Sequence, residues 1–197
     1  MRISSLLFVL LLALGCSKKE QSEGIAVLHS IPEFQLVDHE GKPYGREALQ
    51  GQLTVADFVF THCRSTCPRL TAHMRGLQER VSDVPDASFL SVTVDPENDT
   101  TEVLGAYVEE NDLRDENWRF VTGKEEAIRE LVLRGFRVGM DDAGSETQGG
   151  EEIMHANHFV LVDRSAQVRG YYRADNEGIE HLEKDLRKLS SEPTANH

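Results

Sequence analysis

The sequence has few cysteines and a shortage of basic residues. Three cysteines in 197 residues are too few for a disulfide framework, and a chain of this length does not need one. Its 21 Lys and Arg residues stand against 34 Asp and Glu, which gives a net charge of −13. A chain without a cationic surplus is a poor partner for nucleic acid, because phosphate binding depends on basic side chains. The composition predicts one ordinary globular domain.

Long hydrophobic runs are also absent beyond the N-terminus. The run over residues 3–14 follows Arg2 and is shorter than the ~20 residues of a membrane span, but it fits the core of a signal peptide. It ends in Ala13-Leu14-Gly15-Cys16, which resembles a bacterial lipobox. We therefore expect a signal peptide over 1–15, a lipidated Cys16 and a flexible tether over 16–24. The protein would then be exported and lipid-anchored to the cell membrane, facing the periplasm or the outside; the alternative is plain secretion with Cys16 as a leftover thiol.

The rest of the chain alternates strand and helix patterns over residues 25–189, before a polar tail at 190–197. Apolar runs and periodicity predict strands at 34–38, 53–60, 89–94, 118–121, 136–139, 159–162 and 167–172, and helices at 68–81, 103–108, 125–133 and 179–189. This order predicts an α/β thioredoxin-like sandwich, in which a central mixed β-sheet is flanked by helices and followed by a C-terminal β-hairpin and a closing helix. The first βαβ unit should be parallel with a right-handed crossover.

Two cysteines, Cys63 and Cys67, follow the strand at 53–60. Sites in open α/β sheets lie beyond the carboxyl ends of the strands, so this position is favourable for function. Cysteines four residues apart near a helix start lie close enough for a disulfide or for one shared metal ion, and the helix N-terminus favours the thiolate that either needs. The spacing differs from the two intervening residues of redox thioredoxins. A structural disulfide or two buried thiols are the alternatives.

Two thiolates leave most metal sites incomplete, so a third ligand is needed. His155 and His158 precede the strand at 159–162, which we expect near the middle of the sheet, and they follow a long acidic segment at 141–152 that suggests a functional arm. The residues alone leave both histidines as candidates. His62 adjoins Cys63 and could tune the thiol, whereas His73 is expected to be solvated.

Several segments together resemble the Sco/SenC family, the copper-binding thioredoxin-like proteins of cytochrome c oxidase assembly, across residues 31–189. The matching segments are Asp57-Phe58-Val59-Phe60-Thr61, Cys63-x-x-x-Cys67-Pro68, Thr71-Ala72-His73-Met74, Ser91 to Thr100 with its Asp95-Pro96, Trp118 to Gly123, and Met154 to Asp163. Asp57 departs from the pattern, because the family often has an apolar residue or Asn there.

The resemblance implies copper, as Cu(I) or Cu(II), bound by Cys63, Cys67 and His155. In the family the ligand histidine lies eight residues before the residue that opens the hairpin turn, here Asp163, and His158 is then an additional histidine. Copper suits this donor set, because Cu(I) favours thiolates and Cu(II) also accepts imidazole. A closed structural zinc site would have four ligands. Asp95 could assist the site or simply end its strand.

Two functions follow from the resemblance. The first is a copper metallochaperone that delivers copper to the binuclear copper centre of cytochrome c oxidase, with the oxidase copper-bearing subunit and other copper chaperones as partners. The second is a thiol–disulfide oxidoreductase that keeps the oxidase copper-site cysteines reduced, with Cys63 or Cys67 as nucleophile. A general thioredoxin-type enzyme is disfavoured, because such enzymes place a proline directly before the later strand, whereas the segment directly before Phe159 has no proline.

Overall fold

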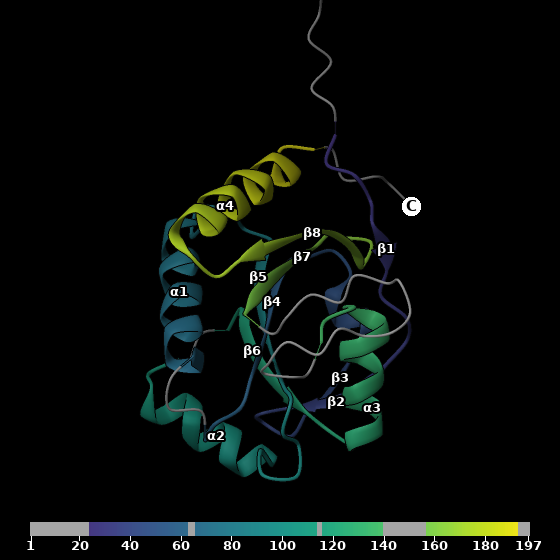
Figure 1. Ribbon diagram of the computed structural model, residues 1–197, viewed down its shortest axis with the longest axis vertical. Coiled ribbons are helices and arrows are strands. Elements are labelled where there is room, and N and C mark those ends of the chain that lie inside the picture. Colours follow the sequence, from purple (N-terminus) through teal and green to yellow (C-terminus); the bar gives the residue numbers. More distant parts are fainter. Residues whose placement is uncertain (1–23, 63–65, 114–115, 140–156, 193–197) are drawn as a thin grey trace, which may run out of the picture.

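One mixed β-sheet organises the chain (Figure 1). The computed structural model describes residues 24–62, 66–113, 116–139 and 157–192. The strands of this part are β1 (His29–Ser30), β2 (Gln35–Asp38), β3 (Pro43–Gly45), β4 (Leu53–Val59), β5 (Ala87–Thr93), β6 (Trp118–Thr122), β7 (His158–Val162) and β8 (Gln167–Arg173). The helices are α1 (Thr66–Arg80), α2 (Thr101–Glu110), α3 (Glu125–Glu130) and α4 (Asn176–Ser190). The strand order is β1-β8-β7-β4-β5-β6-β2-β3.

The two central strands, β4 and β5, run parallel, with Leu53 opposite Ala87 and Val59 opposite Thr93. All seven residues of β4 are buried, which explains its nearly continuous apolar sequence. β7 pairs antiparallel with the other side of β4, and β8 returns beside β7 as the predicted hairpin. The β4-α1-β5 unit and the closing helix are therefore confirmed.

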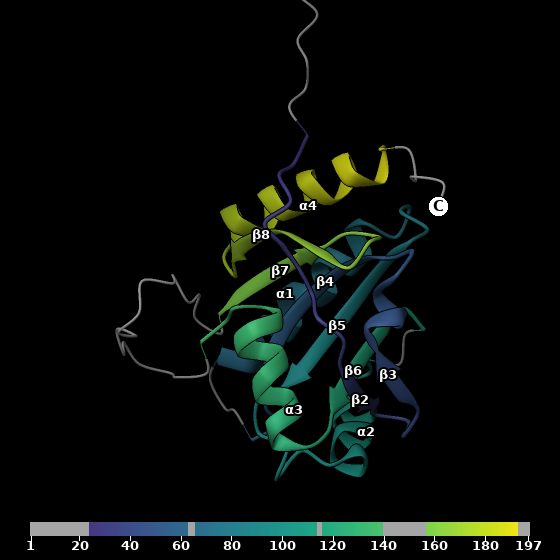
Figure 2. The ribbon, with the colours of Figure 1, turned by 90° about the vertical axis from the view of Figure 1, so that its right-hand side faces the viewer.

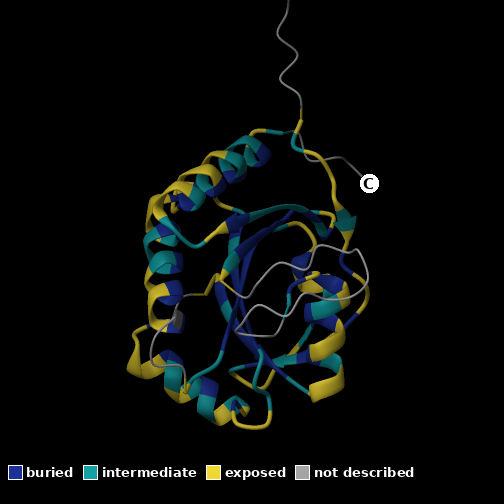
Figure 3. Ribbon diagram, in the orientation of Figure 1, coloured by how far each residue is buried: buried dark blue, intermediate teal, exposed yellow. Residues whose placement is uncertain are grey.

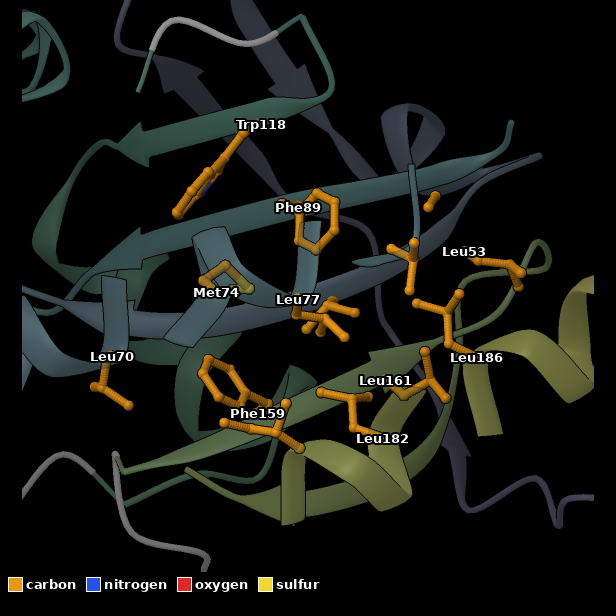
Figure 4. Close-up of a cluster of buried hydrophobic side chains, with 14 of the residues drawn as sticks. Leu53, Leu70, Met74, Leu77, Phe89, Trp118, Phe159, Leu161, Leu182 and Leu186 are labelled. Carbon is orange, nitrogen blue, oxygen red and sulfur yellow. The ribbon is translucent and has the colours of Figure 1, made fainter. Parts of the chain in front are cut away.

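The two faces of the sheet are covered by different helices. α1, α2 and α4 lie over one face and α3 lies over the other, as Figures 1 and 2 show. Because side chains alternate along a strand, Val55 and Val59 enter the first core and Ala56 and Phe58 enter the second. The central strands are accordingly coloured as buried along most of their length in Figure 3. Figure 4 shows the first core, where side chains of α1 and α4 meet those of the sheet.

The expected strand at 136–139 is wrong. The chain after α3 instead continues as a π-helical turn over Leu131–Gly135, and the Val138 amide donates to the Val132 carbonyl at 3.0 Å. Phe136 and Val138 are both fully buried, and the Phe136 ring packs edge-on against Phe58. Val138 forms an isolated β-bridge, and no continuous strand spans 136–139. The alternation of Phe136 and Val138 thus reflects two anchors in the second core.

Three short elements carry too little pattern for sequence-based prediction. β1 has two residues and β3 has three, and a 3₁₀ turn spans Arg46–Leu49. Among the described residues, no helix is both long and apolar enough to cross a membrane. The predicted divisions at 1–15, 16–24 and 190–197 fall largely outside the described residues and stay predictions.

Candidate metal centre

Cys67 lies in the first turn of α1, at the carboxyl end of β4. The chain leaves β4 at Val59, turns at Thr61 and His62, and enters α1 at Thr66, where Pro68 suits the first helical turn. The Cys67 side chain faces the first core and is 5% exposed. Cys63, His155 and Cys16 lie outside the described residues, so their predicted roles stay predictions.

The topology brings a third strand end to this edge. β5 is parallel to β4 and ends beside it, whereas β7 is antiparallel and therefore begins there. His158 is the first residue of β7 and is half-buried. The expectation that this strand lies near the middle of the sheet is confirmed, since β7 is the neighbour of the central strand β4. His155 stands three residues before His158 in the sequence.

Asp99 holds the turn before the cysteines, a role that sequence reasoning missed. Its carboxylate accepts hydrogen bonds from the Thr61 hydroxyl at 2.5 Å, the Thr93 hydroxyl at 2.6 Å and the Thr61 amide at 3.2 Å. Asp99 is fully buried. It therefore joins the exit of β4 to the end of β5. Its position four residues after Asp95, in a segment that matches the family, was the available signal.

Asp95 lies at the same edge but is engaged locally. Its carboxylate accepts from the Asn98 side-chain amide at 2.9 and 3.0 Å, and its own amide donates to the Thr93 hydroxyl at 3.0 Å. These contacts end the strand and start the turn toward α2, whose N-cap is Thr100. His62 is exposed, with its Nδ1 atom 3.3 Å from the Thr61 hydroxyl.

A cavity of about 380 Å³ opens beside the N-terminal half of α1. Its lining combines two histidines, His73 and His158, with two arginines, and is formed by Arg69, Leu70, His73, Asn157, His158, Arg173, Ala174, Asp175 and Asn176. His73 is half-buried here, rather than fully solvated as its sequence context predicted. The cavity places polar and cationic groups next to the helix that carries Cys67.

Three other described histidines lie elsewhere. His29 lies 2.8 Å from the Tyr171 hydroxyl, His39 accepts from the Phe120 amide at 3.3 Å, and His181 is exposed on α4. Burial lowers the pKa of both His29 and His39. Within the part of the chain that the structure describes, no three His, Cys, Asp or Glu residues are grouped to hold a metal ion.

Asp57 is a second buried aspartate, on the face of the sheet that α1 covers. It is fully buried on β4, between Val55 and Val59 of the first core. Its Oδ1 atom accepts from the Ser91 hydroxyl at 2.6 Å, and Oδ2 has no hydrogen-bond partner among the described residues. Burial raises the pKa of Asp57 to about 7, against the lowering effect of the Ser91 hydrogen bond.

The family follows from comparison with known proteins. The SCO1/SenC family model matches residues 24–191, which is most of the chain. The chain belongs to the SCO1/SenC family. This SCO1/SenC chain is 30% identical over 166 residues to the SCO1 protein homolog of Bacillus subtilis, covering 83% of this chain and 84% of the relative. It is 28% identical over 148 residues to a protein of Stutzerimonas stutzeri described as a putative copper-binding protein, covering 74% and 70% of the two chains.

Solved structures agree with the family and the fold. A SCO1/SenC family lipoprotein from Bacillus anthracis superposes with a TM-score of 0.69 at 30% identity, over 83% of this chain and 96% of that one. BsSco, described as a member of the Sco family of cytochrome c oxidase assembly proteins with a disulfide switch, superposes with a TM-score of 0.68 at 29% identity, over 84% and 96%. The predicted thioredoxin-like fold and the Sco/SenC resemblance are therefore confirmed.

Proposed function

We propose that this chain binds copper through Cys63, Cys67 and His155 and delivers it to the binuclear copper centre of cytochrome c oxidase. The observation that carries the proposal is the meeting of strand ends at one edge of the sheet. β4 leads into the dithiol segment at this edge, and β7 begins there, directly after the histidine segment. Family membership and the copper-binding description of the Stutzerimonas relative support copper as the cargo.

The chemistry of this donor set suits a metal that is handed on. Two thiolates satisfy Cu(I), and an added imidazole accommodates Cu(II). A site with three protein ligands leaves room for an incoming ligand from the recipient, as open metal sites do. The proposed partner is the copper-bearing subunit of the oxidase, with other copper chaperones as sources of the metal.

A second candidate function is thiol–disulfide exchange with the oxidase copper-site cysteines. The specific support is BsSco, which is 29% identical to this chain and is described as having a disulfide switch. In this function the Cys63–Cys67 dithiol is oxidised to a disulfide, and a disulfide between two recipient cysteines is reduced to two thiols. The two electrons therefore balance within the exchange.

We also propose that Cys16 carries a lipid, so that the exported domain stays at the cell membrane, facing the periplasm or the outside. The lipobox-like sequence supports this placement, as does the lipoprotein description of the Bacillus anthracis relative. Mass spectrometry of the N-terminal peptide should find a diacylglyceryl group on Cys16. The Cys16→Ala variant should leave the membrane fraction.

Copper analysis of the reduced full chain, purified without oxygen, tests the proposed function. One copper ion per chain is expected, and His155→Ala should weaken Cu(II) binding strongly while His158→Ala serves as the matched control. If His158→Ala weakens binding and His155→Ala does not, the ligand assignment is wrong. If neither variant changes copper binding and the dithiol rapidly reduces disulfide substrates, the exchange function replaces the chaperone function.

A further inference from the structure

The cavity beside α1 gathers cationic side chains in a chain whose net charge is −13. Its lining holds two arginines, Arg69 and Arg173, and two histidines, His73 and His158, against one carboxylate, Asp175. None of these residues belongs to the proposed copper ligand set. A concave site lined by one sign of charge attracts ligands of the opposite sign. The cavity is therefore a candidate site for an anionic group.

The walls of this cavity are held by backbone pairing and core packing. His158, the first residue of β7, pairs with Arg173, the last residue of β8, and the Ala174 amide donates to the Asn157 carbonyl at 3.1 Å. On the opposite wall, Leu70 of α1 is buried in the first core. A site that is already formed loses little conformational entropy when a ligand enters it.

The two arginines of the lining differ in what they contact. Arg173 Nε donates to Asp175 Oδ2 at 2.7 Å, and the other oxygen of Asp175 accepts from the Gly178 amide at 2.9 Å as the N-cap of α4. The charges of Arg173 and Asp175 therefore offset each other. Arg69 is exposed and has no hydrogen-bond or ion-pair partner in the part of the chain that the structure describes. Its charge is thus available to a ligand.

The mixture of groups in the lining favours a carboxylate on an aliphatic stem. Arg69 and His73 lie four residues apart and share one face of α1, so both can donate to the same anion. A planar guanidinium group matches a carboxylate through two parallel hydrogen bonds. Leu70 and Ala174 add an apolar surface for the stem. A doubly charged phosphate fits less well, because Asp175 already offsets one of the two arginines.

The position of the cavity favours a protein ligand over a lipid headgroup. α4 begins at the cavity with Asn176, and its 15 residues extend about 22 Å to Ser190. Gly24, the first described residue, lies at that far end, where a Cβ atom added to it would be 3.9 Å from Glu192. Figure 1 shows the start of the coloured chain beside the end of α4. The predicted lipid tether therefore enters the domain at the end opposite the cavity.

We propose that this cavity receives an aspartate or glutamate side chain of the copper-bearing oxidase subunit, with Arg69 and His73 as its hydrogen-bond donors. The identity of the partner rests on the proposed function, whereas the binding of a carboxylate needs no metal. Leu70 lines the cavity one helical turn after Cys67. A side chain bound there would hold the partner beside the turn that carries Cys67.

A small carboxylate tests the cavity without any partner protein. N-acetylglutamic acid α-amide is titrated into the isotope-labelled, reduced, metal-free full chain, and the backbone amide resonances are followed by NMR. Saturable shifts are expected at Leu70, His73 and Ala174, and the uncharged N-acetylglutamine amide should cause none. Equal shifts with both compounds, or none with either, would overturn the carboxylate site. Inorganic phosphate that shifts the same resonances at lower concentration would show a phosphate site instead.

A second measurement tests the partner. Calorimetry at physiological salt gives the affinity of the reduced, metal-free full chain for the reduced, metal-free oxidase subunit. Arg69→Glu should weaken binding about tenfold, because it places a like charge against the incoming carboxylate, and Arg69→Lys should keep most of the affinity. Arg129→Glu is the matched control, since Arg129 is exposed on α3 over the opposite face of the sheet and the net charge changes equally. Its affinity should equal that of the parent.

The outcomes distinguish this docking site from the proposed function. Equal affinities for the parent, Arg69→Glu and Arg129→Glu, or no binding by the parent, would overturn the docking site. If copper still moves to the subunit in that case, the proposed function stands without it. If Arg69→Glu alone loses affinity but the parent transfers no copper, the docking site stands and the copper function fails.

Discussion

Two fully buried aspartates, Asp57 and Asp99, have contrasting surroundings. Asp99, at the carboxyl ends of β4 and β5, accepts from the Thr61 hydroxyl, the Thr61 amide and the Thr93 hydroxyl. Asp57, in the interior of β4, accepts from Ser91 alone among the described residues. Burial costs a carboxylate little when hydrogen bonds replace its water, and much when they do not. The hydrogen bonds of Asp99 therefore hold the turn at the strand ends in one geometry. The Asp57 carboxyl group, in contrast, can change its charge near neutral pH.

The largest expected effect concerns Asp57 and the pH dependence of stability. Its pKa is about 7 in the folded chain, against 3.8 for an aspartate in water. Between these values the folded state keeps a proton that the unfolded state loses, so stability falls as pH rises through this window. The parent should lose about 4 kcal/mol relative to Asp57→Asn from pH 4 to pH 7, at about 1.4 kcal/mol per unit. Urea unfolding at a series of pH values measures the difference. If the free energy of unfolding changed equally with pH in the parent and in Asp57→Asn, the contrast between Asp57 and Asp99 would be contradicted.

Substitution of Asp99 should lower the stability of the fold at pH 7, whereas substitution of Asp57 should raise it. Asp99→Asn replaces a carboxylate that accepts from three donors by an amide with one acceptor oxygen, which leaves buried donors unsatisfied. We expect a loss of about 3 kcal/mol of stability. Urea unfolding at pH 7 should show Asp99→Asn destabilised while Asp57→Asn is stabilised. A stabilised Asp99→Asn would contradict the structural role of the edge network.

Ser91→Ala tests the side-chain hydrogen bond that Asp57 accepts from Ser91. The change removes the donor to Asp57 Oδ1 and leaves the buried Trp118 indole N–H without its acceptor. A cost of about 2 kcal/mol is expected from the unsatisfied donor. Because the Ser91 hydrogen bond lowers the pKa of Asp57, its loss should also move the pH-dependent step in stability to higher pH. A step that moves to lower pH would contradict this account.

The smallest effect is expected for an exposed aspartate. Asp83 accepts from Arg187 at 2.9 Å on the surface, and this hydrogen bond lowers the pKa of Asp83. Exposed ion pairs of this kind contribute little, because water and salt screen them. Asp83→Asn should therefore leave the thermal midpoint at pH 7 unchanged within error. A loss as large as that of Asp99→Asn would show that burial is not what separates the aspartates.

The sequence predicted the architecture because the main elements carry strong patterns. The apolar run of β4 and the helical spacing of Leu70, Met74 and Leu77 on α1 follow directly from burial on one or two faces. The strand predicted at 136–139 was wrong, because the alternation of Phe136 and Val138 with polar residues resembles a strand pattern. Both side chains are instead buried as separate anchors in the second core. Short edge strands such as β3 leave too few residues for any periodicity.

The site was predictable in its location and less so in its supporting network. Cys67 after a buried strand indicated the edge of the sheet, and the β7 position of His158 follows from the same topology. The roles of Asp57 and Asp99 depend on partners 34 and 38 residues away in the sequence, Ser91 and Thr61, which no local pattern connects.

Copper transfer tests the central claim most directly. The copper-loaded full chain is mixed, without oxygen, with the copper-bearing oxidase subunit whose cysteines are already reduced, and the metal on each protein is measured after separation. The chaperone function predicts that copper moves to the recipient and that its binuclear centre forms, and that Cys63→Ser and Cys67→Ser donors transfer none. If the reduced recipient gains no copper from this chain, but an oxidised recipient has its disulfide reduced by it, the chaperone function is contradicted.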